Sequence, residues 1–360
     1  MVTSTSAMER IYWEKTLNIT SKRTKQTVQL KTLREFFLSS CSREKYIDRA
    51  IDFYIKHGEE FTGISSLIET KKKLLAFYDG KSKRSNREEH MSMAVLKNHL
   101  AISLAEPEII PKILATWENE KRIDPRIRGD FHIHTEFSDS LGTTEEVIKT
   151  AKILGYSWIA LTDHALTTNR DYTMSADKFF KRKEISEKIA PALGIRVYQG
   201  IEANILEDGS LDIPEEIESH LDLAIVSLHK TYNQPYRKIL ERIERALNEN
   251  PRVIALTHPF FAMDVTEQRV NDILDIVEKA NKAVEINLFP IYFKGNKLLF
   301  STAMKRGIKI IFSTDAHCPK ALYSMKFANS FLKGIDTTGI LNLYDNLQGV
   351  IPSSHTRSNL

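Results

Sequence analysis

From about residue 128 onward, short β-branched and apolar runs alternate with stretches of helical periodicity. Such alternation predicts parallel strands joined by crossover helices, which is an α/β fold. A closed barrel is the simplest architecture because it leaves no sheet edge exposed. A doubly wound open sheet is the alternative, and counting strands alone does not exclude it. The expected strands cover residues 130–134, 157–164, 196–206, 223–229, 253–258, 283–288 and 309–317.

The segments between these strands carry helix signals. Thr143 is followed by Glu146 at the spacing of a capping box, which predicts a helix that begins there. Helical periodicity also covers residues 236–247 and 264–280.

Residues 1–127 differ from the rest of the chain in both pattern and charge. Helices are expected at 32–54, 64–78, 87–104 and 107–121, and a basic, turn-rich linker at 79–86. Serines near position 40 allow the first of these to break in two. This part holds 23 Lys and Arg against 17 Asp and Glu, a net charge of +6, whereas the remainder carries −2. We therefore expect a basic, all-helical N-terminal domain (1–127), a barrel domain (128–335) and a C-terminal helix and tail (336–360).

Composition excludes several classes of protein. Hydrophobic residues make up 42% of the chain and charged residues 27%, an ordinary balance for a soluble globular protein. There is no apolar run of the ~18 residues that would span a bilayer, and the N-terminus lacks a signal-peptide pattern. Two cysteines cannot form a disulfide framework. We expect a cytoplasmic protein without a membrane partner.

Ionisable side chains gather where the expected strands end. Carboxyl ends of parallel strands meet on one face of the fold, so these side chains are predicted to converge. Residues two apart on a strand face the same side, so His132 and His134 can grip one ion together. Imidazole with carboxylate suits Zn, Mn or Fe. The candidate metal ligands are His132, His134, Asp139, His164, Glu202, His229, His258, Asp315 and His317.

One histidine at a strand end is more often structural than a ligand. Six histidines on five strands, with Glu202 on a sixth, are not independent accidents. Nine ligands exceed the need of one tetrahedral ion, and they suit two or three divalent ions with a bridging carboxylate. The sequence therefore predicts a multinuclear metal centre.

Six short motifs occur in a fixed order: HIHTEFSD at 132–139, LTDH at 161–164, GIE at 200–202, SLH at 227–229, THP at 257–259 and STDAH at 313–317. Together they resemble the PHP (polymerase and histidinol phosphatase) family of metal-dependent phosphoesterases over about residues 128–335. The lead-in IRGDFH at 127–132 is most similar to the PHP domain attached to bacterial family X DNA polymerases. Phe131 and Ser140 depart from the family pattern without removing a ligand. No polymerase domain is recognisable in residues 1–127.

The resemblance implies a seven-stranded (βα) barrel and three ions. His132, His134, Glu202 and Asp315 would hold the first ion. Glu202 would bridge to a second with His229 and His258, and Asp139, His164 and His317 would hold a third. A metal-activated hydroxide would then attack phosphorus, with His132, His134, Glu202 and Asp315 as the catalytic set. Asp315, or the metal site itself, would manage the proton.

The substrate is less constrained than the chemistry. Lys230 and Arg170 could bind phosphate, although each could equally be a solvated surface cation. Glu285 and Asn287 share one face of a strand and could serve either barrel packing or substrate contact. The polymerase-like lead-in and the basic N-terminal part favour single-stranded nucleic acid or a nucleotide as substrate. One alternative is a small-molecule phosphatase such as a histidinol-phosphate phosphatase. The other is a module that serves a protein assembly through residues 1–127.

Overall fold

The computed structural model describes residues 30–38, 44–61, 69–70, 73–74, 99–120, 122–165, 173–261, 263–289 and 292–351. Contacts divide the chain into two units, Met1–Glu118 and Asn119–Leu360. The three domains expected from the sequence stay a prediction. Among the described residues, no helix is both long enough and apolar enough to cross a membrane.

Apart from Glu106, the described residues of the first unit are helical. It contains α2 (Leu30–Leu38), α3 (Glu44–His57), the 3-10 turns η1 (Gly58–Phe61) and η2 (Pro107–Ile109), and a helical segment over 99–105. Helix α6 (Ile110–Asn119) begins in this unit. Apolar side chains of α2 and α3 are buried at helical spacing, which gives the unit its own core. The expected linker at 79–86 lies outside the described residues.

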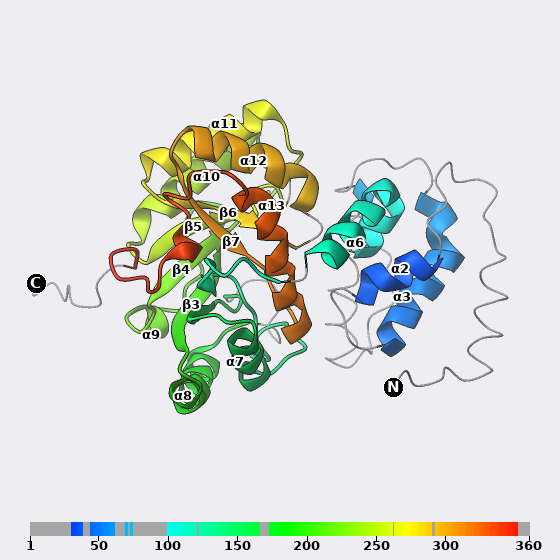
Figure 1. Cartoon of the computed structure of the whole chain (residues 1–360). Helices are drawn as coiled ribbons and strands as arrows, with labels where there is room; N and C mark the ends of the chain where they lie inside the picture. The colour runs from blue at the N-terminus through cyan, green and yellow to red at the C-terminus, as the bar shows by residue number, and fades with distance from the viewer. Residues whose placement is uncertain are drawn as a thin grey trace, which may run out of the picture. The chain divides into compact units, whose positions relative to one another are not determined.

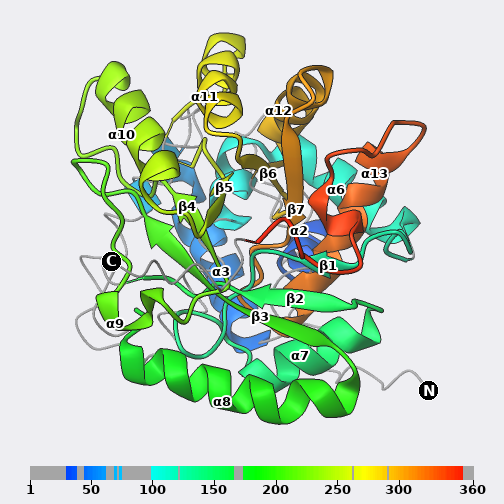
Figure 2. The same cartoon turned by 90° about the vertical axis from the view of Figure 1, so that its left-hand side faces the viewer.

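The second unit is built on seven parallel strands that neighbour one another in chain order. This order excludes the doubly wound alternative, in which the strand order reverses. The strands surround a common interior in Figure 2. They are β1 (Gly129–Asp130), β2 (Trp158–Leu161), β3 (Arg196–Asn204), β4 (Leu223–Ser227), β5 (Val253–Thr257), β6 (Ala283–Asn287) and β7 (Lys309–Ser313).

Helices lie outside the strands, as Figures 1 and 2 show. The capping box expected at Thr143 and Glu146 is confirmed, because both of its hydrogen bonds are present at the start of α7. The covering helices are α7 (Thr144–Ile153), α8 (Ala176–Leu193), α9 (Glu215–Glu218), α10 (Tyr236–Glu249), α11 (Glu267–Lys279) and α12 (Phe293–Lys305). After β7 follow η4 (Pro319–Ala328), α13 (Asn329–Leu332) and η5 (Leu341–Leu343).

Few backbone hydrogen bonds close the barrel between β1 and β7, and two buried side chains bridge this seam: Asp130, which accepts hydrogen bonds from Thr314, and Asn342. Past the strand ends, Ile133 and Ala316 form one parallel bridge. Where β1 begins, the buried Asn342 donates from Nδ2 to the carbonyls of Gly129 and Phe312, both at 2.8 Å. Its Oδ1 accepts from the backbone N–H of Phe312 at 2.6 Å. The amide therefore satisfies backbone groups that a regular strand pair would satisfy itself.

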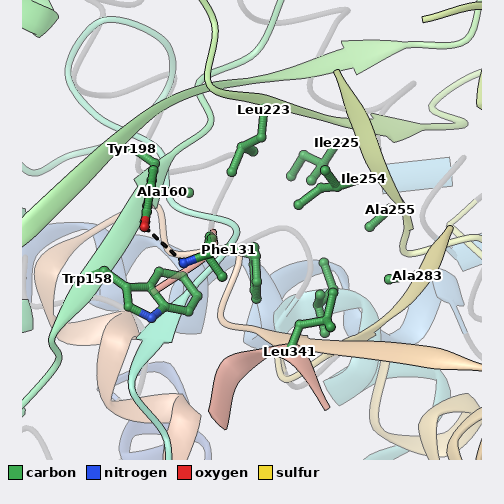
Figure 3. Close-up of a cluster of buried hydrophobic side chains, with 12 residues drawn as sticks. Phe131, Trp158, Ala160, Tyr198, Leu223, Ile225, Ile254, Ala255, Ala283 and Leu341 are labelled. Atoms are coloured by element: carbon green, nitrogen blue, oxygen red, sulfur yellow. Dashed lines mark hydrogen bonds between the residues drawn. The ribbon is translucent and has the colours of Figure 1, made fainter. Parts of the chain in front are cut away.

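A buried apolar cluster fills the barrel at the end opposite the strands' carboxyl termini. It joins inward-facing residues of the strands with Leu341 and Leu347 from the C-terminal segment (Figure 3). Tyr198 accepts a hydrogen bond from the backbone N–H of Leu347 at 3.0 Å. This segment thus packs against the barrel as part of its core.

Two expectations from the sequence are wrong in detail. The first strand is only two residues long, because Ile133 N–H donates to the side chain of Thr162 (3.0 Å) and not to a neighbouring strand's carbonyl. The C-terminal helix expected in 336–360 is absent from 336–351, where the described chain contains only the 3-10 turn η5. Buried leucines and Asn342 hold this segment in irregular backbone.

Candidate metal centre

All nine predicted ligands converge at the carboxyl-terminal side of the barrel. Most of them follow the last regular strand residue, on the irregular extensions of β1, β2, β4, β5 and β7. Glu202 lies within β3 itself. The side chains of His132, His134 and Glu202 are fully buried, whereas those of Asp139 and His317 keep 21% and 19% of their surface. One side of the candidate centre is therefore fully buried, and the other side is partly exposed to solvent.

Glu202 lies in the middle of the group. Its Oε1 is 2.8 Å from His258 Nε2 and 3.4 Å from His229 Nε2. Its Oε2 is 2.7 Å from His164 Nδ1 and 3.4 Å from His132 Nε2. One carboxylate thus faces imidazoles on both of its oxygens, the arrangement expected of a bridging ligand.

A second cluster surrounds Asp315. Its Oδ1 lies 3.2 Å from His134 Nε2 and 3.4 Å from His132 Nε2, and those two nitrogens are 3.1 Å apart. Donor atoms of His132, His134 and Asp315 all lie within 4.8 Å of one another. Asp315 adopts a left-handed backbone with φ of 50°, an uncommon conformation for a residue other than glycine.

A third cluster lies on the exposed side. Asp139 Oδ2 is 3.1 Å from His317 Nε2 and 3.4 Å from His164 Nε2, and Oδ1 is 3.5 Å from His134 Nδ1. These four residues also share a 4.8 Å neighbourhood. The geometry thus contains clusters that correspond to the first and third ligand groups implied by the family resemblance.

Burial and neighbouring charges raise the pKa values of some of these histidines and lower those of others. Burial opposes the charged form of His132, but Asp315 and two further carboxylates outweigh it and hold the pKa of His132 well above its usual value. Burial and the adjacent imidazoles lower the pKa of His134 to about 4. Burial also lowers the pKa of His229 to about 3. On the exposed side Asp139 outweighs burial and raises the pKa of His317 to about 9.

The neighbouring imidazoles also shift the pKa values of the carboxylates. Burial alone would raise the pKa of each, yet the surrounding histidines hold the pKa values of Asp139, Glu202 and Asp315 well below their usual range. Three ionised carboxylates in a largely buried cluster call for positive charge to balance them.

The donor set fits divalent cations. Glu202 Oε2 and His164 Nδ1 are buried and have no hydrogen-bond partner among the described residues, although the two atoms are 2.7 Å apart. Two donor atoms that lie this close, but are not aligned for a hydrogen bond, are arranged as two ligands of one cation would be. Imidazole nitrogens and carboxylate oxygens are ligands for Zn, Mn and Fe. The residues present can therefore hold metal ions.

Sequence reasoning missed the side chains that support these ligands. Asp163 is buried and accepts from Thr135 N–H (2.7 Å), Ser138 Oγ (2.6 Å) and Arg182 Nη1 (2.6 Å). This network fixes the loop that carries Asp139. Thr135, Ser138 and Asp163 lie within the motifs at 132–139 and 161–164, but nothing in those motifs indicates that they contact one another. Arg182 is on the buried face of α8, and the helical periodicity was the signal for it.

The structure says little about the two predicted phosphate contacts, Lys230 and Arg170. Lys230 has an exposed side chain, and its backbone carbonyl accepts from Arg242 Nη2 at 3.1 Å. Arg170 lies outside the described residues. Glu285 and Asn287, which could have served packing or substrate, are both buried and contact predicted ligands: Glu285 meets His132, and Asn287 meets Asp315.

Comparisons with known proteins match a large part of this chain. The family model described as "PHP domain" matches residues 130–288, which include seven of the nine predicted ligands. A protein named DNA polymerase/3'-5' exonuclease PolX from Bacillus subtilis (strain 168) is 29% identical over 206 residues. That match covers 56% of this chain, and it spans only 36% of the relative's length.

Shorter relatives are covered more fully. A protein named "Probable phosphatase" from Thermoanaerobacter sp. (strain X514) is 30% identical over 201 residues, which is 52% of this chain and 78% of that relative. A solved histidinol phosphate phosphatase from Lactococcus lactis, in complex with zinc, L-histidinol and phosphate, has 19% identity and a TM-score of 0.44. The match covers 58% of this chain and 95% of that one.

The seven strands follow one another in chain order around the barrel, and their carboxyl ends bring together the nine expected ligands. The family model matches residues 130–288, and a relative that is 30% identical is covered over 78% of its length. The chain belongs to the PHP domain family of metal-dependent phosphoesterases.

Proposed function

We propose that this protein hydrolyses phosphate esters of single-stranded nucleic acid or nucleotides, as a nuclease does, at a centre of two or three divalent ions. The observation that carries the proposal is the convergence of six histidines and three carboxylates, with Glu202 in their middle. The similarity to a polymerase with exonuclease activity and the basic residues of 1–127 favour nucleic acid over a small substrate.

In this proposal, different residues would hold each ion, and burial distinguishes the residue that would accept a proton. His132, His134 and Asp315 with Glu202 would hold the first ion, Glu202 with His229 and His258 the second, and Asp139, His164 and His317 the third. Divalent ions supply positive charge that activates water and neutralises phosphoryl oxygens. Asp315 keeps 12% of its side-chain surface while Glu202 keeps none, so Asp315 is the better placed to accept the proton of the attacking water. Lys230 and Arg170 would contact phosphate.

A small-molecule phosphatase is the second candidate. The "Probable phosphatase" relative is covered over 78% of its length, far more than the polymerase. An activity of this kind would need no basic surface beyond the metal centre. Service in a protein assembly through residues 1–127 and a cytoplasmic location also stay predictions.

The deciding experiment offers Mn²⁺-loaded protein a single-stranded oligonucleotide labelled at either end, with histidinol phosphate and a mononucleotide as competing substrates. The His132→Ala/His134→Ala double variant is the blank. A Mn²⁺-dependent ladder that is absent from the blank supports the nuclease, and the label lost first gives its polarity. Phosphate release from the small substrates without a ladder would favour the phosphatase instead.

A further inference from the structure

Strand β6 is the one strand of the seven whose end carries no predicted metal ligand. Its inward-facing residues are Ala283 in the apolar cluster and then Glu285 and Asn287, each 1% exposed. A buried carboxylate is costly unless other groups satisfy it. The contacts of Glu285 therefore indicate what this strand contributes to the centre.

Glu285 faces the nitrogen of His132 that points away from the other ligands. Glu285 Oε1 lies 2.7 Å from His132 Nδ1, whereas His132 Nε2 faces Glu202 and Asp315. A carboxylate at Nδ1 stabilises a proton there and leaves the lone pair of Nε2 for a cation. Donor atoms of Glu285, His132 and His258 also lie within 4.8 Å of one another. Because Glu285 meets the ring nitrogen that faces away from Glu202 and Asp315, we assign it a place behind His132 and not among the ligands.

The same carboxylate supports a second ligand. Its other oxygen, Oε2, accepts the backbone N–H of His258 at 2.6 Å. His258 has φ of 24°, in the left-handed range that non-glycine residues rarely adopt. A charge-assisted hydrogen bond to that N–H offsets part of the conformational cost.

Asn287 extends this support to a third ligand. Its Nδ2 lies 3.2 Å from both Glu285 Oε2 and Asp315 Oδ2, so one amide joins the two carboxylates. Asp315 is the other ligand with a left-handed backbone, at φ of 50°. The hydroxyl of Ser313 also donates to Glu285.

We propose that Glu285 is a positioning residue that sets the tautomer and orientation of His132, and that with Asn287 it holds His258 and Asp315 in their strained conformations. The inference rests on the metal centre of the proposed function and is independent of the substrate. The ligands of β1, β5 and β7 are thus oriented by the strand that supplies none.

Glu285→Gln tests this role with almost no change in volume. With the amide oxygen kept toward His258 N–H, the amide NH₂ faces His132 Nδ1 and requires that nitrogen to accept. The proton then moves to Nε2, where it blocks a cation. We expect zinc affinity, measured by isothermal titration calorimetry without substrate, to fall 10- to 100-fold.

Asp222→Asn is the matched control. Asp222 Oδ2 also accepts a backbone N–H, that of Gln199 at 2.7 Å. Asp222 directly precedes β4, at the end of that strand away from the predicted ligands. We expect its zinc affinity to stay within threefold of the wild type. Ser313→Ala leaves the contact between Glu285 and His132 intact, so it should lower zinc affinity less than Glu285→Gln does.

A measurement on the wild type needs no variant. In zinc-loaded protein, long-range ¹H–¹⁵N spectra should show His132 protonated at Nδ1 and bare at Nε2. The opposite tautomer, or equal zinc affinity of the wild type and Glu285→Gln, would overturn the positioning role alone. A wild-type protein that binds no zinc would overturn the metal centre, and with it the inference.

Discussion

At the scale of single residues, we expect the proposed metal centre to depend most on Glu202. Both of its oxygens face imidazoles, and the side chain is fully buried. In Glu202→Gln an NH₂ group replaces one oxygen and directs protons at imidazole nitrogens, so we expect metal content to fall below half and phosphodiesterase activity to fall at least 100-fold. Mass spectrometry of bound metal and hydrolysis of bis-p-nitrophenyl phosphate measure the two effects.

Glu207→Gln is the control for that substitution. Glu207 follows the same strand and is exposed, so this variant should keep wild-type metal content and activity. Full metal loading of Glu202→Gln would contradict the bridging role.

Proton balance at the exposed cluster is a second prediction at residue scale. Asp139 outweighs burial and raises the pKa of His317 to about 9, so without metal His317 carries a proton at pH 7. The stability that this pair gives the metal-free protein is complete below the unfolded pKa of about 6.5 and is lost as pH rises through about 9. A ligand must be neutral, so metal binding at pH 7 should release this proton.

Calorimetry in buffers of different ionisation enthalpy counts the protons released. His317→Gln should release about one proton fewer than the wild type at pH 7. Equal proton release by both proteins would mean that His317 does not give up its proton on binding.

At the scale of elements, we expect the seam between β1 and β7 to depend in part on Asn342, which bridges Gly129 and Phe312. Asn342→Ala removes three side-chain hydrogen bonds and leaves backbone groups of Gly129 and Phe312 buried without them. We expect a loss of about 2–4 kcal/mol in the free energy of unfolding, because each unsatisfied buried group costs about 1–3 kcal/mol. Urea denaturation monitored by tryptophan fluorescence measures it.

Asn346→Ala provides the comparison in the same segment. Asn346 is exposed, and its Oδ1 accepts a hydrogen bond from Gln348 N–H near the surface. We expect this variant to lose less than about 1 kcal/mol. Similar losses for the two variants would show that Asn342 does not hold the seam.

The sequence predicted those elements that depend on periodicity and missed those that depend on single long-range contacts. Alternating apolar runs fixed seven strands, and the residues at their ends fixed the nine candidate ligands. Nothing near Asn342 in the sequence indicates that its amide joins Gly129 to Phe312, some 213 and 30 positions away. Glu285 likewise meets His132 across 153 positions, so only the closed barrel reveals its role.

At the scale of the whole molecule, the two units allow metal chemistry and nucleic-acid affinity to be tested separately. The barrel unit has its own buried core and all nine candidate ligands. A fragment of residues 119–360 should therefore fold, bind as many metal ions as the full chain, and hydrolyse bis-p-nitrophenyl phosphate within about threefold of its rate. Metal analysis and steady-state kinetics measure these quantities.

Oligonucleotide affinity should separate the fragment from the full chain if residues 1–127 contribute their net +6 charge to binding. Counterion release makes such binding fall steeply with salt, so fluorescence anisotropy between 50 and 200 mM NaCl should give a steep slope for the full chain and a shallow one for the fragment. Equal affinities and slopes would remove nucleic-acid docking from residues 1–127. Because the barrel alone would then have to select the substrate, that result would favour a small phosphate ester, the substrate of the phosphatase alternative.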